Sequence, residues 1–293
     1  MTNQKHLKYD VLEHIGRSVW IGEYTSENLF MMLTLYADAS GDVDQDRIIV
    51  AGYVATIEKW TQFDYDWKLL LAKYGLPYFH MSDFAHSRPP FEHLKGQAGT
   101  RRNILSGLAE IIRATVLLSI ASSIRYQDFA TVNKDYALAE AFGCEYAMCG
   151  RDCVVRGQNV LVKMGYQGDR FRAIFEQGDV GHGHLSRILV RDKKVSPIFE
   201  PSRPGIVDGH PGLTPLQAAD FVAYELFKGR QFKDEGKEFR KSLHALSGVP
   251  WYWGQWTLED LLEGAKKANL ERDTMTQERL NQADLGLARE TKD

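Results

Sequence analysis

Three acidic residues stand out by their positions in the sequence rather than by their number. Asp38 follows the apolar run MLTLYA and precedes Ala-Ser-Gly, Glu176 ends the run RFRAIFE, and Asp220 interrupts the apolar segment LQAADFVAYEL. Hard divalent cations such as Mg²⁺ and Mn²⁺ prefer carboxylate oxygens, and two such ions about 4 Å apart can activate water and stabilise a leaving oxygen. The order of the three acids therefore indicates a metal site that hydrolyses phosphodiesters.

Each acid also has a purely structural interpretation. Asp38 is a common type of turn residue before a glycine, Glu176 suits a salt-bridge partner, and Asp220 suits a helix position that faces water. Taken singly, the structural interpretation is favoured for Asp38 and Glu176. For Asp220 the cost of burying an unpaired charge matters more, because the helix around it is apolar. The three acids in this order favour the metal site.

Further candidates lie in two short polar segments. In YFHMSDF, His80 can act as a general base or hold a water molecule, with Asp83 orienting it or joining the metal ligands. An equally weighted alternative is a short edge strand in which His80 bonds locally and Ser82 caps a turn. The segment GDVGHGHL brings Asp179 and two histidines close behind Glu176, but glycine-flanked histidines are more typical of a solvated loop.

The elements that must position these residues alternate between strands and helices. Residues 32–38 and 47–56 predict a hairpin, and apolar spacing over 57–74 predicts a helix. A helix over 101–113 is followed by the strand TVLLSIASSI and a buried, cysteine-bearing helix. The runs RFRAIFE, GHGHLSRILV and VSPIFE then predict strand, helix and strand, before a long helix capped by Thr214. This pattern indicates an α/β domain whose mixed sheet is covered by helices on both faces.

Composition excludes several classes of protein. The chain has 293 residues with 36 basic and 39 acidic side chains, a net charge of −3, which fits neither a basic nucleic-acid coat nor an acidic solvating chain. A hydrophobic content of 44% is that of a globular protein with a real core. No apolar run reaches the roughly 18 residues of a membrane helix, and the first residues lack the apolar core of a signal peptide. We therefore expect a soluble, cytoplasmic protein with no membrane partner.

Four of these segments, YADASGD, YFHMSDF, IFEQGD and LQAADFVAYE, together resemble the domain of unknown function 3800 family. The resemblance spans residues 33–229, and its strongest pieces are Asp38-x-Ser40-Gly41 and Gln217-Ala-x-Asp220. It implies a ribonuclease H-like fold, similarity to metal-dependent nucleases, a bacterial or phage origin, and a role linked to mobile elements or phage defence. It also implies that Asp38, Glu176 and Asp220 bind Mg²⁺ or Mn²⁺.

One position departs from the family pattern. Ala39 stands where the family commonly has a second acidic residue, so any contribution from that side chain is missing. Because successive strand residues point to opposite faces of a sheet, an acid at position 39 need not face the metals.

The resulting hypothesis divides the chain into three parts. Residues 1–30 form an N-terminal arm, 31–230 a ribonuclease H-like catalytic domain, and 231–293 a helical extension that packs on the core. The protein is then a metal-dependent nuclease acting on RNA or DNA, and a homodimer is one option for its oligomeric state. Its catalytic residues are Asp38, Glu176, Asp220, His80 and Asp83.

Two other functions remain open. A ribonuclease H-like module that binds nucleic acid or protein without catalysis is suggested by Ala39 and by the nearly neutral charge. A zinc hydrolase would need several histidines, although their spacing matches no zinc signature; the candidates are His80, His86, His182 and His184. Basic clusters after the histidine segment and after the long helix are available for phosphates, and WYWGQW could stack bases, although an aromatic clamp between extension and core is favoured.

Overall fold

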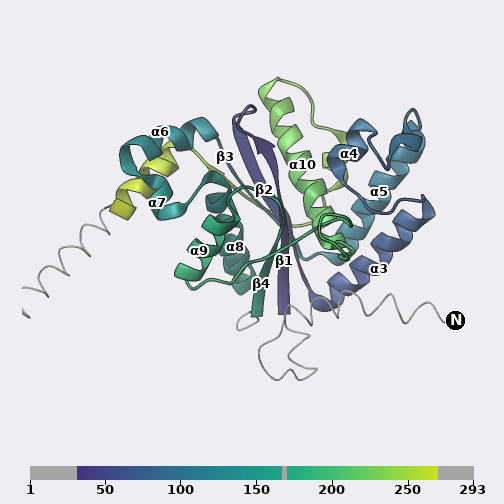
Figure 1. Cartoon of the computed structure of the whole chain (residues 1–293), viewed down its shortest axis with the longest axis horizontal. Helices are drawn as coiled ribbons and strands as arrows, with labels where there is room; N and C mark the ends of the chain where they lie inside the picture. The colour runs from purple at the N-terminus through teal and green to yellow at the C-terminus, as the bar shows by residue number, and fades with distance from the viewer. Residues whose placement is uncertain (1–31, 167–169, 270–293) are drawn as a thin grey trace, which may run out of the picture.

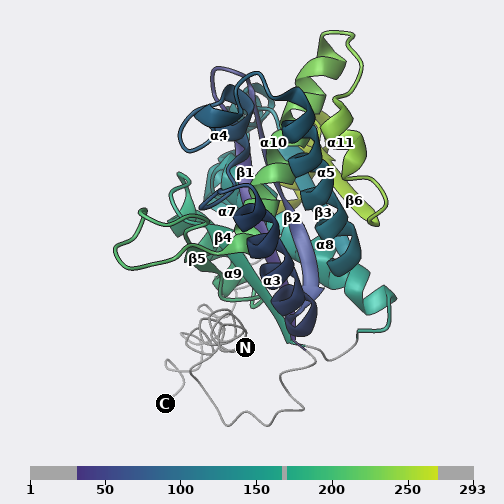
Figure 2. The same cartoon turned by 90° about the vertical axis from the view of Figure 1, so that its right-hand side faces the viewer.

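The structure, a computed structural model, describes residues 32–166 and 170–269. The predicted arm at residues 1–30 and the end of the predicted extension, residues 270–293, lie outside the described residues. The described chain forms an α/β arrangement in which one six-stranded mixed sheet lies between two layers of helices (Figure 1, Figure 2). The predicted α/β class is confirmed.

The sheet has the strand order β5-β4-β1-β2-β3-β6. Its strands are β1 (Met32–Asp42), β2 (Arg47–Thr56), β3 (Leu118–Ile124), β4 (Arg170–Glu176), β5 (Ile198–Glu200) and β6 (Trp251–Trp256). β1, β2 and β3 pair antiparallel in series, so the predicted hairpin is confirmed. β4 and β5 extend the sheet on the other side of β1 and run parallel to it, and β6 runs parallel to β3.

The helices divide between the two faces of the sheet. One face is covered by α10 (Thr214–Asp234), which lies over β1 and β2, together with α3 (Ile57–Lys73) and α5 (Ala98–Thr115); the short helices α4 (Met81–His86) and α11 (Lys241–Ala245) join this layer (Figure 1). The other face is covered by α6 (Tyr126–Tyr136), α7 (Leu138–Phe142), α8 (Glu145–Lys163) and α9 (His182–Arg191). A 3-10 turn, η1 (Glu92–Leu94), precedes α5, and residues 258–269 are helical.

Helix α10 is the central element of the first layer. Residues 214–227 are all buried, so the apolar sequence surrounds the helix instead of forming one stripe, as expected for a helix enclosed by protein. Thr214 does not cap this helix as predicted, since the N-cap residue is Leu213. The Thr214 hydroxyl instead donates to Asp64 Oδ1 on α3 at 2.6 Å, which ties the start of α10 to its neighbour.

Two other local predictions are wrong. The chain does not turn directly after Asp38, because β1 continues to Asp42 and Asp38 pairs with Ala51 inside the ladder. The aromatic segment Trp251–Trp256 does not belong to a helical extension, because it is the edge strand β6 of the main sheet. Its backbone pairs with β3 where side-chain contacts alone were expected.

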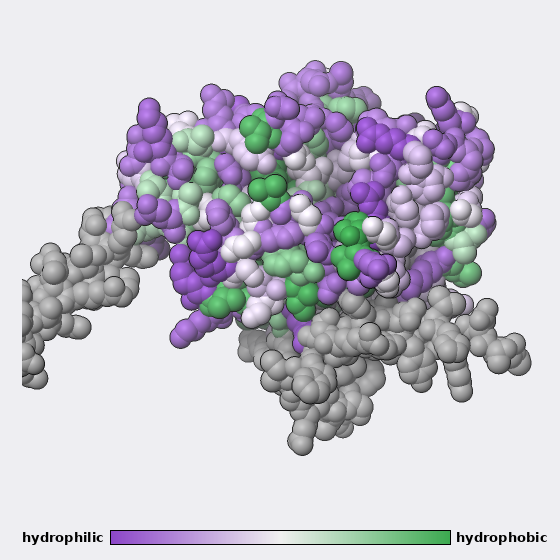
Figure 3. All heavy atoms as spheres, in the orientation of Figure 1, coloured by the Kyte–Doolittle hydropathy of each residue, from purple (hydrophilic) through white to green (hydrophobic). Residues whose placement is uncertain are grey.

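One face of the molecule is mostly polar. Hydrophilic side chains dominate the face shown in Figure 3, and apolar side chains form small separate patches on it. None of the helices in the described part of the chain combines the length and apolar composition that a bilayer crossing requires.

Close contact between β1 and β2 at Gly52 offers a test of the fold. A Cβ atom at Gly52 would lie 1.9 Å from the Tyr36 carbonyl oxygen, so Gly52→Ala must push the two strands apart. We expect the free energy of unfolding to fall by about 3 kcal/mol, measured by urea denaturation. The matched change Gly99→Ala in α5 meets no atom within 4 Å and should leave stability unchanged or slightly raised. Equal effects of the two changes would contradict the β1–β2 pairing.

Candidate active site

Two of the candidate acids lie on adjacent parallel strands. Ala37 of β1 pairs with Phe175 of β4, so Asp38 and Glu176 follow directly after this pair at the end of β4. Side chains alternate along a strand, and the preceding pair of the same phase, Tyr36 and Ile174, packs on the α10 side. Asp38 and Glu176 therefore point to the face that α10 covers.

The third acid comes from α10 itself. Asp220 is buried, with 8% of its surface exposed, so it does not face water. Its Oδ2 accepts a hydrogen bond from the Met81 backbone N–H at 2.5 Å, and its Oδ1 lies 3.8 Å from His80 Nε2. The charge that the apolar helix buries is therefore matched by a backbone donor and approached by an imidazole.

Gln217 binds the same segment one helical turn earlier. Its Oε1 accepts from the Phe79 backbone N–H and from Trp67 Nε1, both at 2.9 Å. Because residues three apart lie on one side of a helix, Gln217 and Asp220 grip the backbone on either side of His80. We call this pair of contacts, Gln217 to Phe79 and Asp220 to Met81, the backbone clamp.

Ser202 connects the backbone clamp to the second strand acid. Its N–H and hydroxyl donate to Glu176 Oε1 at 3.1 and 2.9 Å, and its carbonyl accepts from Gln217 Nε2 at 2.8 Å. Gln217 thus positions both the His80 segment and the loop that holds Glu176. The predicted salt bridge of Glu176 is not formed with any described residue, and its Oε2 accepts no hydrogen bond from these residues.

His80 and Asp83 form the pair that the sequence suggested. His80 ends the extended segment as the N-cap residue of α4, and its Nδ1 lies 2.7 Å from Asp83 Oδ2. Arg203 Nη1 binds the same carboxylate oxygen at 2.9 Å, and Arg88 Nη1 lies 3.9 Å from the other. With Nδ1–H donated to Asp83, Nε2 is left as the imidazole acceptor on the Asp220 side. The alternative of a short edge strand is wrong, because residues 77–80 form no strand.

Of the five predicted catalytic residues, Asp83 supports His80 from behind, and the other four line one cleft of about 630 Å³. Its acidic lining residues are Asp38, Asp42, Glu176, Asp179 and Asp220, and its basic ones are Arg88, Arg203 and Lys228. The sequence argument favoured a solvated loop for Asp179, but Gly178, at φ +119°, turns the chain so that Asp179 joins the cleft. The signal in the sequence that could have placed Asp179 in the cleft was its short spacing from Glu176.

The carboxylates in this cleft are electrostatically unfavourable as a group. Burial raises the pKa of Asp38 well above its usual value, and the charges of Asp179, Asp220 and Glu176 raise it further. Burial raises the pKa of Glu176 to about 7, opposed by the Ser202 hydrogen bonds, and burial raises the pKa of Asp179 to about 7. Burial also raises the pKa of Asp220, although His80 and the Met81 N–H oppose this. Such a cluster favours the binding of protons or cations.

The donor atoms fit a hard divalent cation, but they do not surround one position as they stand. Buried carboxylate oxygens of Glu176 and Asp179 have no hydrogen-bond partner within the described residues. Across residues 32–166 and 170–269, no three His, Cys, Asp or Glu side chains are arranged about a common metal position. Repulsion among like charges favours separated carboxylates, so an ion would bind here with rotation of these side chains.

The histidines proposed for zinc are not brought together. His80 and His86 line the cleft, whereas the His182 ring stacks on Phe199 with centroids 4.3 Å apart and His184 is exposed. Ala39 packs its side chain against the apolar cluster on the α8 side of the sheet. An acid at position 39 would therefore point away from Asp38, as strand alternation predicts.

No family model, no curated protein and no solved structure matches the chain. The cleft itself is therefore the basis for inferring a function. Its distinguishing features are four acids whose pKa values are raised, from two strands, a loop and a helix, beside a His–Asp pair.

The raised pKa of Glu176 predicts a specific pH dependence of stability in chelator-containing buffer. Its folded pKa of about 7 exceeds the usual 4.5, so the folded protein holds the extra proton between these values and its free energy of unfolding falls as pH rises through them. Glu176→Gln, which can keep the Ser202 bonds, should stabilise by about 2 kcal/mol at pH 8 and not at pH 4. Urea denaturation at both pH values measures this. Exposed Glu110→Gln is the control, and a pH-independent effect of Glu176→Gln would refute the assignment.

Because the side-chain amide of Gln217 is buried and hydrogen-bonded, its replacement should strongly destabilise the protein. Gln217→Ala leaves the Trp67 Nε1–H, the Phe79 N–H and the Ser202 carbonyl without their partner, so the free energy of unfolding should fall by about 3 kcal/mol. Exposed Gln62 on α3 bonds only within its own helix, and Gln62→Ala should change stability by less than about 0.5 kcal/mol. Denaturation midpoints that shift equally in the two variants would rule out the proposed role of Gln217.

Proposed function

We propose that the protein is a divalent-metal-dependent nuclease with a ribonuclease H-like fold, which hydrolyses phosphodiester bonds in RNA or DNA. The observation that carries the proposal is the convergence of Asp38, Glu176 and Asp220 in one cleft from β1, β4 and α10. Acids that repel one another at a cost in stability are retained where a cation or a proton uses them.

The topology supports the fold assignment. Three antiparallel strands in series, with two further strands added parallel to β1 on its free side, make up the order 3-2-1-4-5. That order is the one a ribonuclease H-like sheet has. β6 is an addition at the far edge.

The donor set suits Mg²⁺ or Mn²⁺, because every candidate ligand is a hard carboxylate oxygen. Asp38, Glu176 and Asp220 would hold the metal, and Asp179, which the sequence pattern did not single out as a ligand, would join them. A divalent ion held by these carboxylates would polarise the phosphate and lower the pKa of a water molecule bound to it. Ser202 orients Glu176 for this role, and the Met81 N–H orients Asp220.

His80 acts as the proton acceptor in the proposal. Asp83 fixes the imidazole through Nδ1, so Nε2 faces the cleft beside Asp220 and can take a proton from an attacking water. Arg203 balances the Asp83 carboxylate, which keeps Asp83 in its orienting role. Arg88 and Lys228 on the cleft wall are placed to contact phosphate oxygens.

The family assignment belongs to the same proposal. Two of the segments on which the resemblance to the domain of unknown function 3800 family rests, YFHMSDF and LQAADFVAYE, meet in the backbone clamp, and the other two supply Asp38 and Glu176. A cytoplasmic location, a bacterial or phage origin and a role in mobile-element or phage defence follow from that resemblance alone.

A second candidate is a binding module of the same fold without catalysis. It is favoured by the absence, within the described residues, of three side chains already arranged about a metal position. Calorimetric titration with Mn²⁺ separates the two candidates. The nuclease proposal expects binding that is lost in Asp38→Asn, whereas a module without catalysis needs no cation affinity.

Cleavage assays give the direct test. Purified protein should cut single-stranded or duplex RNA or DNA with Mg²⁺ or Mn²⁺ and not with chelator, and Asp38→Asn and Asp220→Asn should each lower the rate about 100-fold or more, because each removes a charged metal ligand. Asp44→Asn is the matched control, since Asp44 is exposed in the β1–β2 turn. Full activity in both cleft variants would exclude the proposal.

A further inference from the structure

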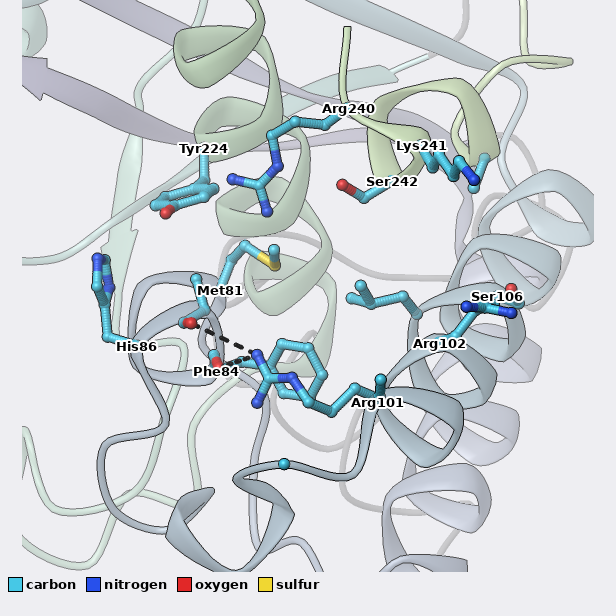
Figure 4. Close-up of a pocket in the computed structure, with 15 residues that line it drawn as sticks. Met81, Phe84, His86, Arg101, Arg102, Ser106, Tyr224, Arg240, Lys241 and Ser242 are labelled. Carbon is cyan, nitrogen blue, oxygen red and sulfur yellow. Dashed lines mark hydrogen bonds between the residues drawn. The ribbon is translucent and has the colours of Figure 1, made fainter.

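A second cavity opens beside the acidic cleft. It has a volume of about 840 Å³ and is bordered by α4 and α5 on one side and by α10 and α11 on the other (Figure 4). His86 and Tyr224 line both cavities, so the two are contiguous. We call this second cavity the basic pocket, because of the side chains described next.

The charge of the basic pocket is opposite to that of the cleft. Four cationic side chains line it, and none of its lining residues is acidic. Two come from α5 and two from the segment before and at the start of α11; they are Arg101, Arg102, Arg240 and Lys241. The acidic cleft thus continues directly into a site with the charge that phosphate oxygens prefer.

Arg240 is held in place by a buried carboxylate. Glu225 on α10 is fully buried, with 0% of its surface exposed, and its Oε1 lies 3.2 Å from Arg240 Nη2. The Arg240 guanidinium also lies over the Tyr224 ring, 5.4 Å from its centroid. Figure 4 shows this guanidinium pointing into the basic pocket. Fixing a guanidinium in advance lowers the entropic cost of binding an anion.

Arg101 is positioned without neutralising its charge. Its Nη2 donates to the Phe84 carbonyl at 2.6 Å, its Nη1 donates to Ser87 Oγ at 3.2 Å, and its guanidinium lies 4.2 Å from the centroid of the Phe84 ring. Neutral acceptors and an aromatic face therefore hold this side chain. No acidic partner contacts it in the part of the chain that the structure describes.

The remaining two cations mark the end of the basic pocket that lies away from the cleft. Figure 4 shows His86 at one end and Arg102 with Lys241 at the other. Both of these cationic side chains are exposed, and neither forms an ion pair within residues 32–166 and 170–269. Between the two ends the wall is apolar, with Met81, Phe84 and Leu105. Charges along the rim and an apolar wall suit a chain of phosphates that carries bases.

We propose that the basic pocket binds backbone phosphates of the substrate strand on one side of the cleavage position, and that Arg102 and Lys241 hold the phosphate farthest from the acids. This inference rests on the proposed nuclease function, since the acidic cleft defines the cleavage position. A continuous ligand is favoured over a separate small anion because the cavities share His86 and Tyr224. The substrate segment in the pocket is single-stranded, because its bases must face the apolar wall.

Binding without turnover tests the inference. Fluorescence anisotropy of a short labelled single-stranded oligonucleotide, as DNA and as RNA, is measured in chelator over a salt series with the full chain. The double variant Arg102→Gln/Lys241→Gln should weaken binding about tenfold at low salt. Its plot of log affinity against log salt should be shallower by about 1.4, or about 0.7 for each phosphate charge that the variant no longer neutralises. Arg240 is avoided because its removal strands the buried Glu225.

The control removes the same charge from the opposite face. Lys134→Gln/Lys163→Gln changes exposed residues on α6 and α8 and should keep the wild-type affinity and slope. The inference is overturned if the slope is unchanged in Arg102→Gln/Lys241→Gln or if the wild type does not bind. In either case, cleavage by the wild type would still support the nuclease. If the double variant lowers the salt slope of binding but the wild type never cleaves nucleic acid, the result would support the pocket and refute the nuclease.

Discussion

The backbone clamp is the constraint on which the candidate active site depends. Gln217 and Asp220 project from one side of α10 and bind the chain at Phe79 and Met81, which leaves His80 fixed between them. The same amide of Gln217 reaches Ser202 and so reaches Glu176. One helix therefore sets the positions of an acid on its own surface, a histidine about 140 residues earlier and an acid on β4. In a buried setting these bonds cannot be replaced by water, so the geometry is maintained by the cost of breaking them.

Much of the fold follows from signals that are local in the sequence. β1, β2, α3, β4, α9 and α10 are encoded by apolar periodicity and by stop signals, and the structure places them close to the predicted ranges. The choice of Asp38 and Glu176 as partners was also accessible, since each acid directly follows an apolar strand sequence. What the pattern could not supply was the length of β1, because Ala-Ser-Gly permits a turn and a strand equally; the pairing of Asp38 with Ala51 decides it.

Features that depend on long-range contacts were beyond the sequence. The family resemblance marked Gln217 but did not identify its three partners, which lie on α3, before α4 and near β5. The sequence around Asp179 is typical of a solvated loop, and the turn at Gly178 is what places this residue in the cleft. The aromatic segment at Trp251 carried a strong side-chain signal that concealed its backbone role, because its strand partner, β3, is remote in the chain. Tertiary pairing overrides local pattern in each case.

Strand β6 completes the sheet only late in the synthesis of the chain. Ser119 of β3 pairs with Trp251, so during translation the outer edge of β3 stays without its partner until the chain beyond residue 251 has left the ribosome. Asp220 arrives only shortly before this, so the acidic cleft and the complete sheet form at nearly the same stage. A chain that ends before residue 251 would expose the open edge of β3, which is the kind of surface that chaperones and proteases recognise.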